Sequence, residues 1–330
     1  PNLDLYYPWN LDANKSIEIA KECEQIALEQ SEINNSDGAE LSSFEGESVY
    51  ANSNGLIANL KSSRHSLYCS LIAKRGDEMQ TAYEYSVAID SNDLTAPANI
   101  GLEAARLAQE KLGSRHLGPQ KCPIIFTSRQ SSGIFSQLLG ALSGSRQYKK
   151  TSFLLESLGS QVLPESISIY EDPLKLKTLG SRAFDRDGVL KKKQFFVKEG
   201  IVSSYLMGQY SANQMGLEST ANAGGVSNCC VNSNFDGGIT DLTKSMDRGL
   251  IVTDLMGHGI NATTGDYSRG ASGFWVENGE IKYPVSGITI AGNLKDMLNN
   301  VVSIASDVDF RSNLKVGSTL ISEMTISGEG

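Results

Sequence analysis

Residues 250–298 constrain the fold most strongly, because strand patterns flank a dense set of glycines there. The run Leu250-Ile251-Val252 has the length of a buried strand. Glycine then occupies five of the next positions, all within residues 257–273: Gly257, Gly259, Gly265, Gly270 and Gly273. Because glycine has no Cβ, this density predicts a surface loop whose backbone turns sharply or closely approaches another chain.

Regular elements are predicted after the glycines. Residues 274–283 match a hairpin, since Asn278-Gly279 suits a type I′ turn. Ile288 and Ile290 alternate as in a further strand. Asn293, with Asp296, is placed to cap a helix. The apolar stripe of that helix runs over Leu294, Met297, Leu298, Val301, Val302 and Ala305.

The first third of the chain predicts helix, antiparallel meander and helix. Asn14 can cap a helix that runs to about Gln30. Residues 39–90 then change to a period of two, with a half-buried tyrosine-rich strand at residues 81–89. Ala96-Pro97 opens a second helix, which ends before Gly113. This order is typical of an α+β unit.

A polar segment at residues 114–120 separates this unit from the rest, which predicts domains at residues 1–115 and 116–330. The second domain is predicted to be mostly β. It begins with a strand at 124–126 and a helix at 133–143, and a hairpin turns at Glu199-Gly200. Two segments, 313–320 and 323–326, end the pattern. No parallel βαβ pattern is evident.

Composition excludes some partners. The chain has 330 residues, 40% of them hydrophobic, and a net charge of −9. An acidic chain without a basic run is a poor match for nucleic acid or anionic membranes. The longest uncharged stretch is rich in serine, glycine and glutamine, so no membrane-spanning helix is predicted. Five scattered cysteines without CxxC spacing predict reduced thiols in a cytoplasmic protein.

Metal ligands are scarce. The three histidines, His65, His116 and His258, are each more than fifty residues from the next, and none precedes a glutamate. Zinc hydrolases need two or three histidine or carboxylate ligands on rigid elements, so we predict no metal site in this chain.

Other motifs lack their structural context. Gly257 to Ala262 matches G-x-G-x-x-A, but no amphipathic helix follows. Asp185 to Gly188 starts like a calcium loop without the closing glutamate, which favours a plain turn. Ser268, Ser272 and His258 have no G-x-S-x-G elbow. Cys229-Cys230 is interpreted as inert packing.

A second glycine-rich loop spans residues 216–225. It is either a tight connection between strands or a backbone surface to which a peptide hydrogen-bonds by strand addition.

Three runs of sequence closely resemble the TldE (PmbA) branch of the TldD/PmbA family: STANAGG at 219–225, SGSRQYKKTSFLLESLG at 143–159, and the run from Thr264 to Leu298. The resemblance implies a cytoplasmic two-component peptidase that cleaves unstructured peptides and carries the older name modulator of DNA gyrase. TldD-type subunits carry a zinc-binding H-E-x-x-x-H helix, and TldE-type subunits pair with them as a heterodimer. The family's N-terminal stretch is expected upstream of Pro1.

The sequence departs from the TldD pattern at the metal helix. Phe135, Ser136 and Gly140 stand where His, Glu and His would be, and Val226-Ser227-Asn228 lacks an expected histidine before the asparagine. The resemblance therefore implies a subunit without catalytic or metal-binding residues, with zinc in its TldD-type partner. Substrate contacts are expected at Ser219, Thr220, Asn222, Gly224, Gly225, Asp266, Tyr267 and Arg269.

Two alternatives stay open. The chain could be a metal-free hydrolase, or a peptide-binding or regulatory protein without a peptidase partner. A homodimer is possible when the partner is absent.

Overall fold

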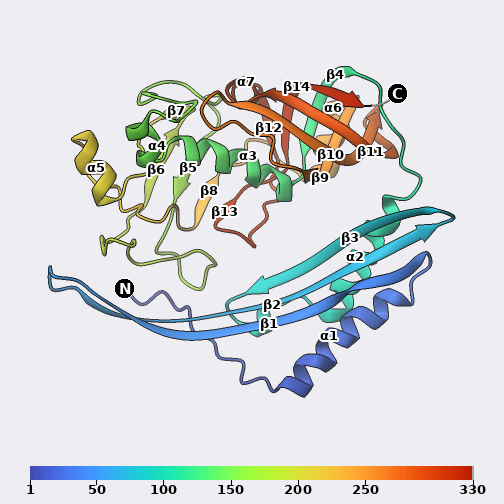
Figure 1. The fold of residues 1–330 in the computed structure, drawn as a ribbon, viewed down its shortest axis with the longest axis horizontal. Helices are drawn as coiled ribbons and strands as arrows, with labels where there is room; N and C mark the ends of the chain where they lie inside the picture. The colour runs from blue at the N-terminus through green and yellow to red at the C-terminus, as the bar shows by residue number, and fades with distance from the viewer. Residues whose placement is uncertain (329–330) are drawn as a thin grey trace. The chain divides into compact units, whose positions relative to one another are not determined.

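The computed structural model describes residues 1–328 and divides them into two compact units. One unit comprises Asn2–Ser114 with Leu176–Leu179, and the other comprises Arg115–Lys175 with the chain from Gly180 onward. Figure 1 shows the elements of each unit. The predicted α+β class is confirmed, with a helix-and-antiparallel-sheet unit first and a β-rich unit second.

The N-terminal unit is built on a three-stranded antiparallel sheet in the order β1-β2-β3. In chain order its elements are α1 (Ala13–Leu28), β1 (Ile33–Ala51), β2 (Ile57–Arg75), β3 (Glu78–Ala88), the short 3-10 helix η1 (Ser91–Asp93) and α2 (Pro97–Glu110). Strands β1 and β2 pair along their whole length, whereas β3 pairs with β2 only between His65 and Arg75. The far half of the β1–β2 hairpin is therefore two-stranded, as Figure 1 shows.

Helices α1 and α2 pack against each other and on one face of this sheet (Figure 1). Small residues make the close packing possible: a Cβ on Gly101 of α2 would lie 2.1 Å from the carbonyl oxygen of Cys23 in α1. The buried side chains of the unit meet between helices and sheet: Cys23, Ala27, Leu67, Cys69, Leu71, Ile100, Ala104 and Ala105.

The cap of α1 differs from the prediction, whereas the predicted tyrosine-rich strand is half-buried as expected. Asp12, not Asn14, caps α1, because its side chain accepts a hydrogen bond from the Lys15 N–H at 2.9 Å. In β3 the inward positions are those of the small residues Ala82 and Ser86, while Tyr83 is 37% exposed on the opposite face. The helices cover only one face, so the tyrosines lie on the other.

The larger sheet of the C-terminal unit has the strand order β11-β10-β9-β4-β14-β12. These strands are β4 (Gln120–Phe126), β9 (Gly249–Met256), β10 (Asp266–Glu277), β11 (Glu280–Asn293), β12 (Val301–Ile304) and β14 (Thr319–Gly328). Strand β11 also pairs with β14, so five of the strands close into a ring. Strands β4 and β9 are parallel, and because more than a hundred residues separate them, they form no short βαβ unit that the sequence pattern could reveal.

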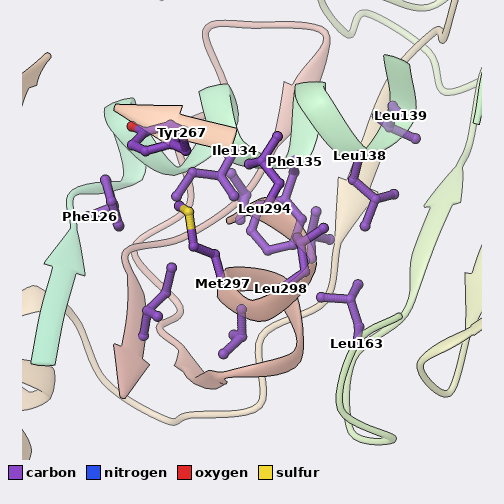
Figure 2. Packing of buried hydrophobic residues seen from close by; sticks show 14 of the residues in the cluster. Phe126, Ile134, Phe135, Leu138, Leu139, Leu163, Tyr267, Leu294, Met297 and Leu298 are labelled. Carbon is purple, nitrogen blue, oxygen red and sulfur yellow. The ribbon is translucent and has the colours of Figure 1, made fainter. Parts of the chain in front are cut away.

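A second, smaller sheet has the order β13-β8-β5-β6-β7. Its strands are β5 (Ile169–Glu171), β6 (Gln194–Lys198), β7 (Ile201–Val202), β8 (Cys229–Val231) and β13 (Leu314–Lys315). The helices of the unit are α3 (Ser128–Ala141), α4 (Gly144–Lys149), α5 (Gln209–Met215), α6 (Ile239–Met246) and α7 (Leu294–Asn299). Figure 2 shows side chains of α3 and α7 in one apolar core. Both predicted hairpins are present, with Asn278-Gly279 and Glu199-Gly200 at positive φ.

Three predicted boundaries in this unit are wrong. Helix α7 ends at Asn299, and the β-branched residues that follow form β12, where Val301 pairs with Ile321. The predicted segment 323–326 is part of the longer strand β14. The second half of the glycine-rich stretch is not a loop, because β10 begins at Asp266, whereas residues 257–265 connect β9 to β10 as a loop.

No helix among residues 1–328 combines the length and apolar character needed to cross a membrane.

Candidate functional site

The loop at residues 219–225 connects α5 to β8 and folds inward onto the preceding chain. The backbone N–H groups of Thr220 and Asn222 both donate to the carbonyl oxygen of Met207, at 3.1 and 3.0 Å. The Thr220 hydroxyl donates to Asn222 Oδ1 at 2.8 Å, and Ser219 Oγ donates to the same Met207 oxygen at 3.2 Å. These predicted contacts are therefore used within the chain, and the tight-connection interpretation describes the first half of the loop.

The two glycines are the most exposed residues of this loop, whereas Ser219, Thr220 and Ala223 are half-buried. Gly224 and Gly225 are exposed and have φ values of +95° and +97°, a region that side chains with a Cβ rarely adopt. A Cβ on Gly224 would lie 2.8 Å from Cδ of Arg186, whereas one on Gly225 would meet nothing within 4 Å. Gly225 therefore needs glycine for its backbone conformation alone, and Gly224 also needs it for space.

A buried carboxylate holds the loop in this shape. Glu171 is fully buried, and its oxygens accept hydrogen bonds from Asn222 Nδ2 at 3.0 Å and from the Ser227 N–H at 2.8 Å. Gln194 Nε2 donates to the same carboxylate at 2.9 Å and to the Thr220 carbonyl at 2.8 Å. One side chain therefore anchors both ends of the glycine loop, and the Ser227 position, where histidine was expected, is one of its anchors.

The countercharge of Glu171 is Lys191, which is 1% exposed. Lys191 Nζ lies 3.2 Å from Glu171 Oε1 and donates to the carbonyl oxygen of Ala221 at 2.6 Å. Burial lowers the pKa of Lys191, although the nearby Glu171 carboxylate opposes that shift. A second buried lysine, Lys315, contacts Asn228 Oδ1 and has its pKa lowered by burial.

The sequence analysis missed these buried ions. A signal was present, because Ile167, Ile169 and Glu171 alternate, and the first two are fully buried. A charged residue that continues the buried side of a strand must find a partner in the core. The partner itself, twenty residues away, could not have been deduced from spacing.

The second predicted contact region, at residues 266–269, is the start of strand β10. Asp266 is exposed and accepts from the Thr264 hydroxyl at 2.6 Å. Arg269 Nε donates to the Gly257 carbonyl at 3.1 Å. Tyr267 is 3% exposed and lies in the apolar core, near residues of α3 in Figure 2.

The Tyr267 hydroxyl is buried without a hydrogen-bond partner of good geometry among residues 1–328. Burial raises the pKa of Tyr267 to about 12, and the nearby Arg269 guanidinium opposes the rise. Tyr267 and Arg269 are two residues apart on a strand and share a face, whereas Asp266 lies on the other. No hydrogen bond or ion pair among the described residues joins this region to the loop at 219–225.

The glycines of this region have a packing explanation. A Cβ on Gly273 would lie 1.7 Å from the carbonyl oxygen of Ile251, and one on Gly259 would lie 1.8 Å from that of Ser268. Neither distance is compatible with a side chain. The close approach that glycine density predicts is therefore made within this chain, between two strands at Gly273 and between a loop and a strand at Gly259.

The three residues that stand at the positions of the metal helix lie in α3. Phe135 is fully buried in the core (Figure 2), Ser136 is exposed, and Gly140 lies beside the guanidinium of Arg146. His65 forms hydrogen bonds with the Ser43 hydroxyl and the Tyr7 carbonyl. Within residues 1–328, no three His, Cys, Asp or Glu side chains form a group that could hold a metal ion.

Comparison with known proteins places this fold in a class. Residues 6–112 match the central domain and residues 119–328 the C-terminal domain of the PmbA/TldA metallopeptidases. Together the two matched domains cover most of the chain, and both belong to one protein family. The chain belongs to the PmbA/TldD family.

Several relatives support this membership. The chain is 45% identical to a metalloprotease PmbA homologue of Haemophilus influenzae, over 99% of this chain and 73% of that protein. Its fold matches a proposed modulator of DNA gyrase from Bacteroides thetaiotaomicron with a TM-score of 0.94 and 28% identity, over 100% of this chain and 75% of the other.

More distant matches come from both branches of the family. A metalloprotease TldD homologue of Buchnera aphidicola is 23% identical over 68% of this chain and 50% of its own length. The structure of TldE from Thermococcus kodakarensis shares the fold, with a TM-score of 0.83 and 22% identity over 97% of this chain and 75% of that one.

Proposed function

We propose that this chain is the TldE-type subunit of a two-component, zinc-dependent peptidase that cleaves unstructured peptides. The chain itself supplies no metal ligands, and a TldD-type partner supplies zinc and activates water. A heterodimer is the working form, and the chain alone could form a homodimer. A cytoplasmic location is part of the proposal, because all five cysteines are free thiols.

The observation that carries the proposal is the set of side chains available to bind a metal ion. The family is one of metallopeptidases, yet the residues of α3 that stand at the positions of the metal helix include a buried phenylalanine and a glycine. Neither can bind a metal ion, and the described residues offer no alternative group of three ligands. These residues do not fit zinc, so the chemistry is assigned to a partner.

The contribution of this chain to peptide binding is proposed for the exposed backbone at Gly224 and Gly225, with Arg269 and Asp266 as further polar contacts. Of the eight residues expected to contact substrate, Ser219, Thr220 and Asn222 are bound internally and Tyr267 is buried. We therefore propose that these four residues hold the shape of the site rather than contact the peptide.

Reconstitution with a TldD-type subunit tests the proposal. Each subunit is purified, its zinc content is measured, and cleavage of an unstructured peptide is followed for each alone and for the mixture. We expect zinc in the partner only and cleavage by the mixture. A variant partner lacking the first histidine of its H-E-x-x-x-H helix is the control and should be inactive.

Two results would contradict the proposal. Cleavage by this chain alone in excess chelator would indicate a metal-free hydrolase. Repeated failure to isolate a TldD-type partner with it from its native cell would indicate a binding or regulatory protein.

A further inference from the structure

Arg186 lies directly beside the exposed end of the glycine loop. Its side chain packs on Gly224, where a Cβ would lie 2.8 Å from both Cδ and Nε of the arginine. Only glycine leaves room for this contact. Arg186 is itself exposed. The backbone proposed to contact a peptide therefore has an arginine at its edge.

A buried carboxylate fixes the backbone of this arginine to the loop. Asp185 is 2% exposed, and its Oδ2 accepts a hydrogen bond from the Ala223 N–H at 2.9 Å. Its Oδ1 accepts from the N–H groups of Asp187 and Val189 at 2.9 and 3.0 Å. The Arg186 N–H donates to the carbonyl oxygen of Ala223 at 3.0 Å. The turn that resembles a calcium loop in sequence therefore joins Arg186 to the glycine loop.

The two neighbouring carboxylates do not neutralise Arg186. The Asp185 oxygens accept from three backbone N–H groups, and Asp187 Oδ2 accepts from the Gln209 N–H at 2.7 Å. Among residues 1–328, the Arg186 guanidinium has neither an ion pair nor a hydrogen bond. An arginine held in this way keeps its N–H donors available for a ligand.

The surrounding stretch reverses the charge of the chain. From Arg182 to Lys193 there are five cationic residues and two acidic ones, although the whole chain has a net charge of −9. Lys191 and Lys193 have carboxylate partners at 3.2 and 3.8 Å. Arg182, Arg186 and Lys192 are exposed and form no ion pair within the described part of the chain. This stretch therefore favours a negatively charged ligand over a positively charged one.

We propose that Arg186 selects a carboxylate on a peptide that crosses the backbone at Gly224 and Gly225. The planar guanidinium can bind a carboxylate through two parallel N–H···O hydrogen bonds. An aspartate or glutamate side chain, or the terminal carboxylate of the peptide, supplies the two oxygens. The presence of a peptide at this backbone is part of the proposed function, on which this inference rests. Backbone contacts accept any side chain, whereas Arg186 adds a preference for acidic peptides over neutral and basic ones.

Fluorescence anisotropy measures this preference on the full chain without a partner subunit. The neutral probe is a labelled nine-residue peptide, Ala-Gly-Ser-Ala-Gln-Ala-Ser-Gly-Ala, with an amidated C-terminus. One acidic probe has glutamate in place of glutamine, the other has a free terminal carboxylate, and a basic probe has lysine. We expect at least one acidic probe to bind about fivefold more tightly than the neutral one, with a difference that shrinks at high salt. The probe that gains affinity identifies the source of the carboxylate.

Two variants test the role of the arginine. Arg186→Gln keeps an aliphatic stem against Gly224 and removes the charge, so it should bind acidic and neutral probes equally. Arg186→Glu should prefer the lysine probe. The matched control is Lys198→Gln on β6, which removes one exposed positive charge elsewhere in the same unit. It should keep the preference of the unmodified chain, and circular dichroism should show that all three variants are folded.

Three results would overturn the inference. They are no binding of any probe, equal binding of the neutral probe and both acidic probes, and an equal loss of preference in Arg186→Gln and Lys198→Gln. Because neither zinc nor a partner subunit is present, these failures are separate from a failure of the reconstituted peptidase.

Discussion

The carboxylate of Glu171 and the ammonium group of Lys191 form an ion pair at 3.2 Å in which the side chains are 0% and 1% exposed. Around it lie the amides of Asn222 and Gln194 and the backbone N–H of Ser227. This arrangement fixes the glycine loop at residues 219–225 to the small sheet of the C-terminal unit. It also predicts what happens when one charge is removed.

Replacing Glu171 with leucine should destabilise the C-terminal unit strongly. The substitution leaves Lys191 buried without its countercharge and removes the acceptor of three other donors, a loss of about 3–5 kcal/mol. The double variant Glu171→Leu/Lys191→Met should recover part of this loss, because both charges are then absent. Urea unfolding followed by fluorescence measures the difference, and a double variant less stable than the single one would contradict the expectation.

Replacing Tyr267 with phenylalanine should not reduce stability near neutral pH. The substitution removes a buried hydroxyl that has no well-placed partner, so the free energy of unfolding should be unchanged or higher by about 1 kcal/mol. Thermal unfolding at pH 7 checks this. A loss of more than about 1 kcal/mol would show that the hydroxyl makes a stabilising contact.

The same residue predicts a pH dependence in alkali. Burial raises the pKa of Tyr267 to about 12, so between about pH 10 and 12 the folded chain keeps a proton that the unfolded chain has lost. The free energy of unfolding keeps this contribution in full below pH 10 and loses it as the pH rises through 12, a total loss of roughly 2–3 kcal/mol. The Tyr267→Phe variant should lose less stability over this interval, and identical pH profiles for both proteins would contradict the assigned shift.

Two glycines in helices should respond to alanine in opposite directions. Gly101→Ala places a Cβ 2.1 Å from the Cys23 carbonyl, so α1 and α2 must separate, at a cost of about 1–3 kcal/mol or more. Gly133→Ala in α3 meets nothing within 4 Å and should stabilise by about 0.5–1 kcal/mol, because alanine favours a helix. Denaturant midpoints of the two variants provide the comparison, and a neutral Gly101→Ala would disprove the tight crossing.

Valine at Gly224 and Gly225 should reduce peptide turnover by the reconstituted complex, by roughly tenfold if the loop positions substrate. Both residues have positive φ, so each substitution distorts the exposed backbone. Gly216→Val is the matched control: its φ is +64°, a Cβ there meets nothing within 4 Å, and it lies outside residues 219–225. Unchanged turnover in the Gly224 and Gly225 variants, or an equal loss in the control, would remove the loop from the site.

Local signals predicted much of this fold. Period-two alternation identified the meander, Asn278-Gly279 and Glu199-Gly200 identified hairpins, and Pro97 marked the start of α2. These predictions succeeded because each element depends on interactions between residues only a few positions apart in the chain. The stretch at 257–273 was interpreted as a loop, which is right for residues 257–265 and wrong from Asp266 onward, because a missing Cβ does not reveal whether the close neighbour belongs to a turn or to a strand.

The candidate site was predicted less completely. The loop at 219–225 was found from its composition, but the inward direction of Thr220 and Asn222 depends on Glu171, about fifty residues earlier. The exposed glycines and the buried polar residues look alike in sequence, and only their partners distinguish them.

The sequence by itself determined the α+β class, the positions of most strands and turns, and the scarcity of histidine, because these follow from local periodicity, backbone preference and composition. Only the tertiary structure decided which charges are buried together and which glycines lie against a neighbouring backbone. Those properties depend on contacts between residues far apart in the chain, and no local pattern specifies which distant groups meet.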